Sequence, residues 1–256
     1  MFNKSSRLLR INVSADAFLT AKWRYLVMLN YRVDAALLRP YVPAGTQLDS
    51  WKGENYISLV GFQFLDTKIL GLPIPWHRNF EEVNLRFYVR RVVNGELRRG
   101  VVFLKEIVPR FAIAFVARQL YNEKYVTQPM SHEHLYSKDN STQLERVNYS
   151  WGNSSKRCAL TISVTGSPAS IAAGSQEEFI TEHYWGYAQQ RNGTALEYHV
   201  AHPRWSIWNA EDAMFCGDAS NLYGRTFNEI ISRKPGSAFL ADGSEVSVYK
   251  GVVIEP

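Results

Sequence analysis

Residues 82–108 read EVNLRFYVRRVVNGELRRGVVFLKEIV, and this stretch carries the clearest local structural signal in the chain. Its two halves are rich in β-branched and aromatic residues, which favour strands. They flank the dipeptide Asn94-Gly95, which favours positive φ at both central positions of a type I′ turn. The pattern therefore predicts an antiparallel hairpin with a two-residue loop, in which Val93 pairs with Glu96 and Arg86 lies opposite Phe103.

The first strand of this hairpin alternates strictly between apolar and polar side chains. Its apolar face consists of Val83, Leu85, Phe87 and Val89, and its polar face of Glu82, Asn84, Arg86 and Tyr88. In one interpretation the polar face lies in water, as on a sheet covered on one side only. In the other it faces the interior of a barrel, where Arg86 would bind a carboxylate and Glu82 would act as acid, base or orienting partner.

The register of the hairpin decides which charged residue of the second strand joins this polar face. A two-residue loop places Lys105 opposite Asn84 and beside Glu82, whereas a loop one residue longer would place Glu106 there. A lysine desolvated near Arg86 would have a lowered pKa, as a Schiff-base nucleophile requires at neutral pH. A surface ion pair between Lys105 and Glu82 explains the same residues.

The remaining sequence favours further strands and a few helices. Strands are predicted at residues 22–31, 56–64, 124–130, 144–151, 158–164, 195–202 and 247–254, and helices at 35–42, 112–121, 175–187, 209–220 and 221–231. Within residues 22–31, alternate residues from Trp23 to Tyr31 share one parity. Gly61 indicates a bulge or a close approach to the backbone. Residues 66–80 form a long apolar loop that we expect to fold over the surface as a lid or an ordered coil. Exposed aromatic residues in this loop would fit either a lid or a subunit contact in a homo-oligomer.

Composition indicates one globular domain. The 256 residues are 46% hydrophobic and 13% aromatic, and no linker divides them, so residues 1–256 are expected to form a single domain with residues 1–17 as a flexible tail. The net charge of +5 is spread in short pairs such as Arg90-Arg91, so we expect no nucleic-acid partner. No apolar run has the length of a signal peptide or a membrane span, which predicts a cytoplasmic protein without a membrane partner.

Metal and cofactor signals are weak. The histidine pairs His132/His134 and His199/His202 could converge on a metal, but this spacing is generic and solvated histidines explain it, so we assign no metal and no other cofactor. Cys158 and Cys216 are far apart and are expected to be reduced thiols. The chain contains no GxSxG, GxGxxG, GxxxxGK[ST] or HExxH motif. His183 lies on the predicted helix whose aromatic residues Phe179, Tyr184 and Tyr187 form a buried stripe, which predicts a hydrogen-bonded core or pocket histidine.

Several stretches together resemble a known family. They are WRYLV (23–27), VDAALLRPYVP (33–43), LDSWKG (48–53), FEEVNLRFYV (80–89), ARQLYNEKY (117–125) and EFITEHY (178–184). This order resembles the YqjF-like family of uncharacterised bacterial proteins, over the chain up to about residue 205, which leaves residues 206–256 as a divergent C-terminal segment. That family is related in fold to acetoacetate decarboxylase. The resemblance implies a mainly β fold with a few helices, arranged as a cone-shaped antiparallel β barrel around an internal cavity.

The resemblance also suggests residue roles. In acetoacetate decarboxylase a lysine forms a Schiff base with a β-keto acid, a short interval after an arginine at the end of a helix. Here Arg118 matches that arginine, but Tyr125 occupies the position assigned to the lysine. Glu82 resembles the pocket glutamate of the decarboxylase, and Asn84, Arg86 and Tyr88 resemble the strand motif of the YqjF-like family.

Three hypotheses follow, and whether the protein is an enzyme stays open. In the first, the pocket binds a small anionic or carbonyl-bearing molecule, which Arg86 and Arg118 orient while Glu82 and Tyr125 supply hydrogen bonds or proton transfer. In the second, Lys105 is a relocated Schiff-base nucleophile of a keto-acid decarboxylase, dehydratase or aldolase. In the third, the protein is structural or regulatory, without catalysis, and its polar strand faces solvent. The residues proposed to bind ligand are Asn84, Arg86, Tyr88, Arg118 and His183.

Overall fold

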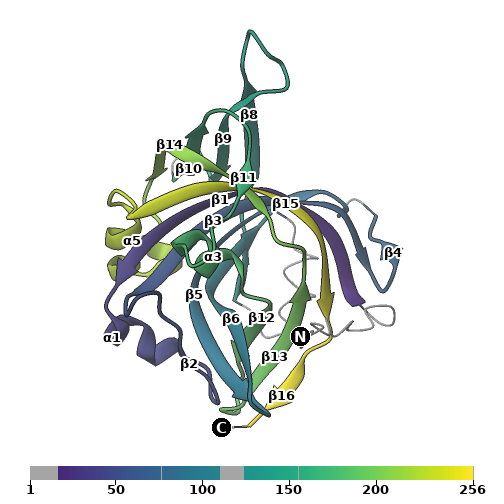
Figure 1. Cartoon of the computed structure of the whole chain (residues 1–256), viewed down its shortest axis with the longest axis vertical. Helices are drawn as coiled ribbons and strands as arrows, with labels where there is room; N and C mark the ends of the chain where they lie inside the picture. The colour runs from purple at the N-terminus through teal and green to yellow at the C-terminus, as the bar shows by residue number, and fades with distance from the viewer. Residues whose placement is uncertain (1–16, 76, 110–123, 155, 256) are drawn as a thin grey trace, which may run out of the picture.

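The computed structural model describes residues 17–75, 77–109, 124–154 and 156–255. These residues form a mainly β protein with short helices at its periphery (Figure 1). The strands are β1 Ala17–Val33, β2 Gln47–Leu48, β3 Asn55–Ile69, β4 Leu72–Pro73, β5 Phe80–Val93, β6 Glu96–Val108, β7 Tyr125–Thr127, β8 Met130–Tyr136, β9 Leu144–Trp151, β10 Cys158–Val164, β11 Ala169–Ser170, β12 Trp185–Gln189, β13 Ala195–Ala201, β14 Ser206–Cys216, β15 Ser237–Tyr249 and β16 Val252–Ile254. The helices are α1 Ala35–Leu38, the 3₁₀ helix η1 Arg39–Tyr41, α3 Gln176–Thr181, α4 Ser220–Tyr223 and α5 Arg225–Ile231.

The main sheet runs in the order β13, β12, β6, β5, β3, β1 and β15. β15 then pairs back with β13, through Val200 opposite Val248 and Ala201 opposite Ser247. The sequence of strand pairings therefore returns to its starting strand. All of these pairings are antiparallel except that between β12 and β6.

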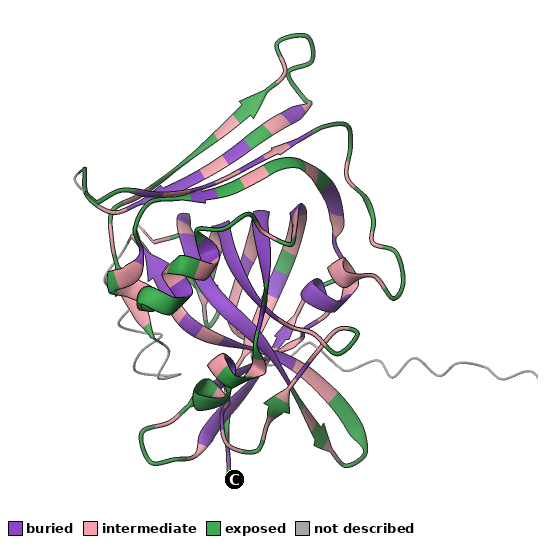
Figure 2. Cartoon of the chain, turned by 90° about the vertical axis from the view of Figure 1, so that its left-hand side faces the viewer, coloured by how far each residue is buried: buried purple, intermediate pink, exposed green. Residues whose placement is uncertain are grey.

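A second layer of strands covers one side of this sheet (Figure 2). β14 connects the two layers, because it pairs first with β15 and further along with β10. The close approach predicted at Gly61 is present between the layers: a Cβ there would lie 2.9 Å from both Leu160 and Tyr149. The larger hydrophobic core lies at this contact, and a second core lies on the opposite, inner face of the main sheet.

The predicted hairpin is confirmed, but a bulge changes its register. Val93 pairs with Glu96 and Arg86 with Phe103, and Asn94 and Gly95 both have positive φ, as predicted. Beyond Phe103 the register shifts by one residue, so that Lys105 lies opposite Leu85. The extra residue of a bulge reverses the alternation of side chains beyond it. The prediction that Lys105 lies opposite Asn84 is therefore wrong.

β1 contains a similar irregularity. Its pairing with β3 shifts between Arg24 and Val27, and Tyr25 has a φ of 54°. Trp23 consequently packs with the inner core, whereas Tyr25 packs with the outer one. The prediction that alternate residues from Trp23 to Tyr31 share one face fails at this bulge.

The predictions for the other strands and helices are confirmed in part. Strands at residues 144–151, 158–164 and 195–202 are confirmed to within one residue, as is the helix start at Ser175, whose hydroxyl accepts a hydrogen bond from the Glu178 amide. That helix ends at Thr181, however, and residues 185–189 form β12. Residues 209–216 belong to β14 rather than to a helix, whereas α4 and α5 agree with the helix predicted at 221–231. The helix predicted at 112–121 lies outside the described residues.

The loop predicted at residues 66–80 is partly regular. β3 extends to Ile69 and pairs with the two-residue strand β4.

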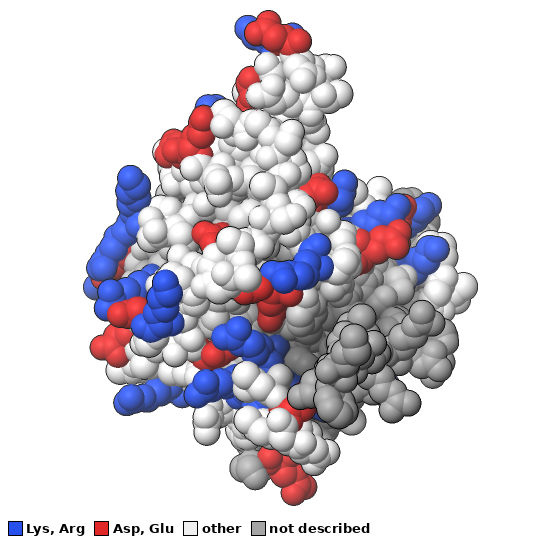
Figure 3. Space-filling view, in the orientation of Figure 1, with Lys and Arg blue, Asp and Glu red and all other residues white. Residues whose placement is uncertain are grey.

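Elsewhere, both cysteines are free thiols. None of the helices in the described ranges has the length and apolar character needed to cross a membrane. On the face shown in Figure 3, basic and acidic side chains are interspersed, in agreement with the charge pattern of the sequence.

Candidate functional site

A cavity of about 180 Å³ lies on the inner face of the main sheet. Strands β1, β3, β5, β6, β12, β13 and β15 contribute to its wall, together with Tyr125 of β7, Thr181 at the end of α3 and His183 after it. Most of the wall is apolar. Its polar residues are Thr67, His77, Glu82, Asn84, Arg86, Glu106, Tyr125, Thr181, His183, Tyr198 and His202.

β5 supplies the polar centre of the cavity because both of its faces are buried. Glu82, Asn84 and Arg86 are 3%, 1% and 8% exposed, so the interpretation in which this face lies in water is wrong. Their apolar neighbours on β5 pack instead into the outer core. Tyr88 lies on the same inner face, beyond the residues that line the cavity, and its hydroxyl is hydrogen-bonded to buried Ser58 at 2.5 Å. A ligand contact of Tyr88 stays a prediction.

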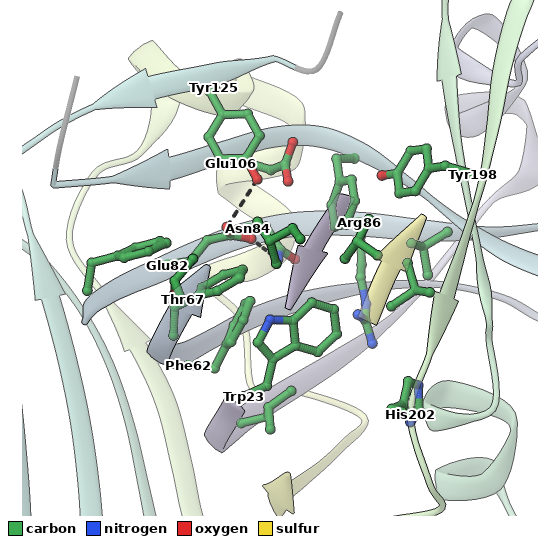
Figure 4. Close-up of a pocket in the computed structure, with 18 of the residues that line it drawn as sticks. Trp23, Phe62, Thr67, Glu82, Asn84, Arg86, Glu106, Tyr125, Tyr198 and His202 are labelled. Atoms are coloured by element: carbon green, nitrogen blue, oxygen red, sulfur yellow. Dashed lines mark hydrogen bonds between the residues drawn. The ribbon is translucent and has the colours of Figure 1, made fainter. Parts of the chain in front are cut away.

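Glu82 is held at both carboxylate oxygens. Asn84 Nδ2 donates to Oε1 at 2.9 Å, and the Tyr125 hydroxyl donates to Oε2 at 3.2 Å (Figure 4). Burial raises the pKa of the Glu82 carboxyl to about 7, although both hydrogen bonds and the charge of Arg86 lower it. A carboxyl with this pKa exchanges protons readily near neutral pH.

Tyr125 reaches Glu82 because β7 runs parallel to β6, with Tyr125 beside Glu106. Burial, together with the neighbouring carboxyls of Glu106 and Glu82, raises the pKa of the Tyr125 hydroxyl well above its ordinary value. Tyr125 is therefore a protonated hydrogen-bond donor at neutral pH.

Arg86 is a buried cation without a carboxylate partner among the described residues. Its Nη2 donates to the Ile180 carbonyl oxygen at 3.4 Å and lies 4.0 Å from the Met28 sulfur, while its Nε has no hydrogen-bond partner. Buried charges in proteins are normally paired or hydrogen-bonded. An unpaired guanidinium in a cavity wall is therefore suited to bind an anion.

Two histidines lie near Arg86. His183 packs against Tyr88, with ring centroids 4.7 Å apart, and its Nε2 lies 3.5 Å from Asp49 Oδ2 without forming a hydrogen bond. His202 stacks on Trp205 at 4.2 Å. Burial lowers the pKa of each histidine to about 4; the charge of Arg86 contributes to this lowering, while Asp49 opposes it at His183. Both rings are therefore neutral at pH 7.

The lysine predicted as a nucleophile lies elsewhere. The bulge in β6 turns Lys105 towards the face of Leu85 and brings Glu106 into the cavity wall, so the requirement that Lys105 face inward is not met. Lys124 lies over the ring of Tyr41, outside this wall. No lysine occurs among the described residues that line the cavity. Arg118, predicted to bind the ligand, lies outside the described residues.

The histidines considered as metal ligands do not converge. His132 contacts Glu81 on the outer side, and His199 lies between Trp185 and Tyr249. In the part of the chain that the structure describes, no group of three or more histidine, cysteine or acidic side chains could hold a metal ion.

Comparisons with known proteins identify the family. The family model DUF2071, described as an uncharacterized conserved protein, matches residues 20–245. The chain belongs to the DUF2071 family. This DUF2071 protein is 26% identical over 208 residues to the uncharacterized protein YqjF of Bacillus subtilis. The aligned region covers 81% of this chain and 82% of YqjF. The match extends well past residue 205, where the resemblance in the sequence weakened.

Solved structures show that the DUF2071 chain has an acetoacetate decarboxylase-like fold. An acetoacetate decarboxylase-like enzyme from Sphingomonas wittichii superposes with a TM-score of 0.66 at 14% identity, over 94% of each chain. The enduracididine biosynthesis enzyme MppR, solved in complex with pyruvate, superposes with a TM-score of 0.65 at 13% identity, over 98% of this chain and 97% of MppR.

Sequence reasoning missed several residues of the cavity in this DUF2071 chain. From the sequence, Glu106 was expected on the polar face only if the hairpin loop were one residue longer. The bulge that places it in the cavity wall has no turn motif that would reveal it in the sequence. His202 was considered only as a metal ligand. The aromatic residues Trp23 and Phe62 were recognised as strand residues, but nothing in their spacing distinguishes an inner core from a cavity wall.

Proposed function

We propose that the cavity binds a small anionic or carbonyl-bearing molecule, with Arg86 contacting the negative charge. The observation that carries this proposal is the buried guanidinium without a carboxylate partner among the described residues, in the same wall as Glu82 and Tyr125. A bound carboxylate would supply the hydrogen bonds that the guanidinium lacks. The same ligand would bring its remaining polar groups within reach of Glu82 or Tyr125.

Glu82 favours proton transfer to or from this ligand. Its pKa of about 7 makes it an effective acid or base near neutral pH. Asn84 and Tyr125 fix the orientation of the carboxyl through one hydrogen bond to each oxygen. A molecule with an acidic C–H next to a carbonyl group could give its proton to Glu82, and the resulting enolate oxygen could accept a hydrogen bond from a donor in the wall.

The relatives support a ligand of this kind. The structural neighbour MppR was solved with pyruvate, which is both a carboxylate and a ketone. The returning strand pairings support a cone-shaped β barrel as the architecture around the cavity, as in the acetoacetate decarboxylase-like fold. In this chain Tyr125 takes the place that the sequence resemblance assigns to the Schiff-base lysine, so the proposed chemistry uses no covalent amine intermediate.

Calorimetric titration with pyruvate tests the binding proposal. The variant Arg86→Met should weaken binding at least about tenfold, because a charge-assisted contact contributes about 1.5–3 kcal/mol. Arg90→Met, which removes an exposed arginine from the same strand, is the matched control and should bind as the unaltered protein does. Equal affinity of the Arg86→Met and Arg90→Met variants would contradict the proposal.

Deuterium exchange tests the proton transfer. In D₂O the methyl protons of pyruvate, followed by NMR, should be replaced by deuterium faster when the protein is present than in buffer alone. Glu82→Gln should remove this acceleration while pyruvate still binds. An exchange rate that Glu82→Gln leaves unchanged would exclude Glu82 as the base.

A further inference from the structure

One side of the cavity is lined by aromatic rings that the proposed contacts with Arg86 and Glu82 leave unused. This side, the aromatic wall, consists of Trp23, Phe62, Phe64, Phe80 and Trp205. Trp23 contacts Phe62 and Phe64 edge to face, with ring centroids 5.3 and 5.7 Å apart. Phe64 stacks on Phe80 at 4.6 Å. These rings come from β1, β3, β5 and the segment before β14, so the fold gathers them from distant parts of the sequence.

Arg86 connects the aromatic wall to the polar part of the cavity. Figure 4 shows its guanidinium directed towards the side where Trp23 and His202 lie, away from the Glu82–Tyr125 pair. It is the only lysine or arginine among the described residues of the wall. The nearby His183 and His202 are neutral at pH 7, because burial lowers the pKa of both. The described wall therefore offers one positive charge beside a large apolar surface.

The volume sets the size of the group that the aromatic wall can accept. A cavity of about 150 Å³ lined by apolar side chains can hold benzene. The cavity here measures about 180 Å³, which leaves room for one ring and a short polar chain. A molecule as small as pyruvate would leave much of the aromatic wall without a contact.

Building on the proposed function, we propose that the ligand is a monocarboxylate with an aromatic or similarly bulky apolar body. Its carboxylate pairs with Arg86 beside His183 and His202, and its apolar body lies against the aromatic wall. A carbonyl group between these two parts would face Glu82. A second carboxylate would be buried against apolar rings without a cation, which is unfavourable.

Calorimetry with matched ligands tests this assignment. Phenylpyruvate should bind at least about tenfold more tightly than pyruvate, because its ring buries apolar area against the aromatic wall. 2-Phenylethanol, which has the ring but no carboxylate, should bind more weakly than phenylpyruvate. Arg86→Met should remove the difference between phenylpyruvate and 2-phenylethanol.

Variants of the aromatic wall separate this inference from the proposed function. Phe62→Leu should weaken phenylpyruvate binding severalfold more than it weakens pyruvate binding, while Val253→Ala on the exposed face of β16 should change neither. Phe64→Leu provides an independent test within the same wall if Phe62→Leu does not fold. Pyruvate binding that depends on Arg86, with no preference for phenylpyruvate, would overturn the inference alone. Absence of binding by both keto acids would overturn the proposed function as well.

Discussion

At the scale of single residues, the environment of Glu82 explains why its carboxyl differs from a surface carboxyl. Burial disfavours the charged form, while Asn84, Tyr125 and Arg86 favour it, and burial has the larger effect. Arg86 is close enough to lower the pKa of Glu82 but forms no ion pair with it. The charge of Arg86 is therefore available to an anionic ligand.

The raised pKa of Glu82 predicts a dependence of stability on pH. The folded carboxyl has a pKa of about 7 against an ordinary value of 4.5, so the folded state holds this proton more tightly than the unfolded state does. Its favourable contribution is complete below pH 4.5 and is lost as the pH rises through 7, by up to about 3 kcal/mol. Urea unfolding between pH 4.5 and 7.5 should show that the unfolding free energy of the protein falls relative to that of Glu82→Gln as the pH rises.

The comparison with Glu82→Gln isolates this carboxyl from the histidines. His183 and His202 have lowered pKa values, so the stability they contribute is present above pH 6.5 and is lost as the pH falls towards 4. This contribution is common to both proteins and cancels in the difference. Glu133→Gln, at an exposed position, is the control and should give a constant difference. A constant difference for Glu82→Gln too would show that its carboxyl is not perturbed.

At the scale of elements, a single bulge in β6 determines the chemistry of the cavity. If the same residues paired regularly beyond Phe103, Leu104 would lie opposite Leu85 and Lys105 opposite Asn84, and the amine of Lys105 would enter the cavity. With the bulge, Glu106 takes this place and is 2% exposed. The hairpin turn was predictable because Asn-Gly is a local signal, whereas the bulge depends on how the strands curve and pack.

The position of Lys105 predicts the result of borohydride trapping. With pyruvate and borohydride, intact mass should show no stoichiometric adduct on Lys105, because its side chain lies on the opposite face of β6 from the cavity. Lys105→Met should have the same mass change as the unaltered protein. A stoichiometric adduct that maps to Lys105 and is lost in Lys105→Met would show that the amine reaches the ligand.

At the scale of the whole molecule, the C-terminal segment completes the structure around the cavity. β15 pairs with β1, β13 and β14, and Val248 contributes to the cavity wall. The segment after residue 205 was treated as divergent from the sequence resemblance, yet it joins the two layers of strands. These pairings support one domain that includes both ends of the described chain.

Removal of β15 should therefore prevent folding. A chain that ends at residue 234 loses β15, one of the two strands that pair with β1, and should show no near-ultraviolet circular dichroism and no cooperative thermal transition. A chain that ends at residue 251 lacks β16, in which Val252 and Val253 are exposed and Ile254 alone is buried, and should fold. A cooperative transition in the shorter chain would show that residues 1–234 form an independent domain.

Local sequence patterns predicted much of the secondary structure and the polar residues of the site. It predicted the Asn94-Gly95 hairpin, the Ser175 helix cap and the strands at 144–151, 158–164 and 195–202, because turns, caps and side-chain alternation depend on neighbouring residues. It also identified Glu82, Asn84 and Arg86 as one polar face.

The direction in which this polar face points, and the residues that it contacts, follow from the packing of the strands. The same alternation suits a strand in water and a strand around a cavity, and burial of both faces of β5 selects the second. Residues 185–187 became part of β12 rather than of a helix because they pair with β13 and, at Trp185 and Gly186, with β6. The choice between Lys105 and Glu106 depended on one extra residue in a strand. Such outcomes depend on contacts between residues far apart in the chain, which local sequence patterns do not contain.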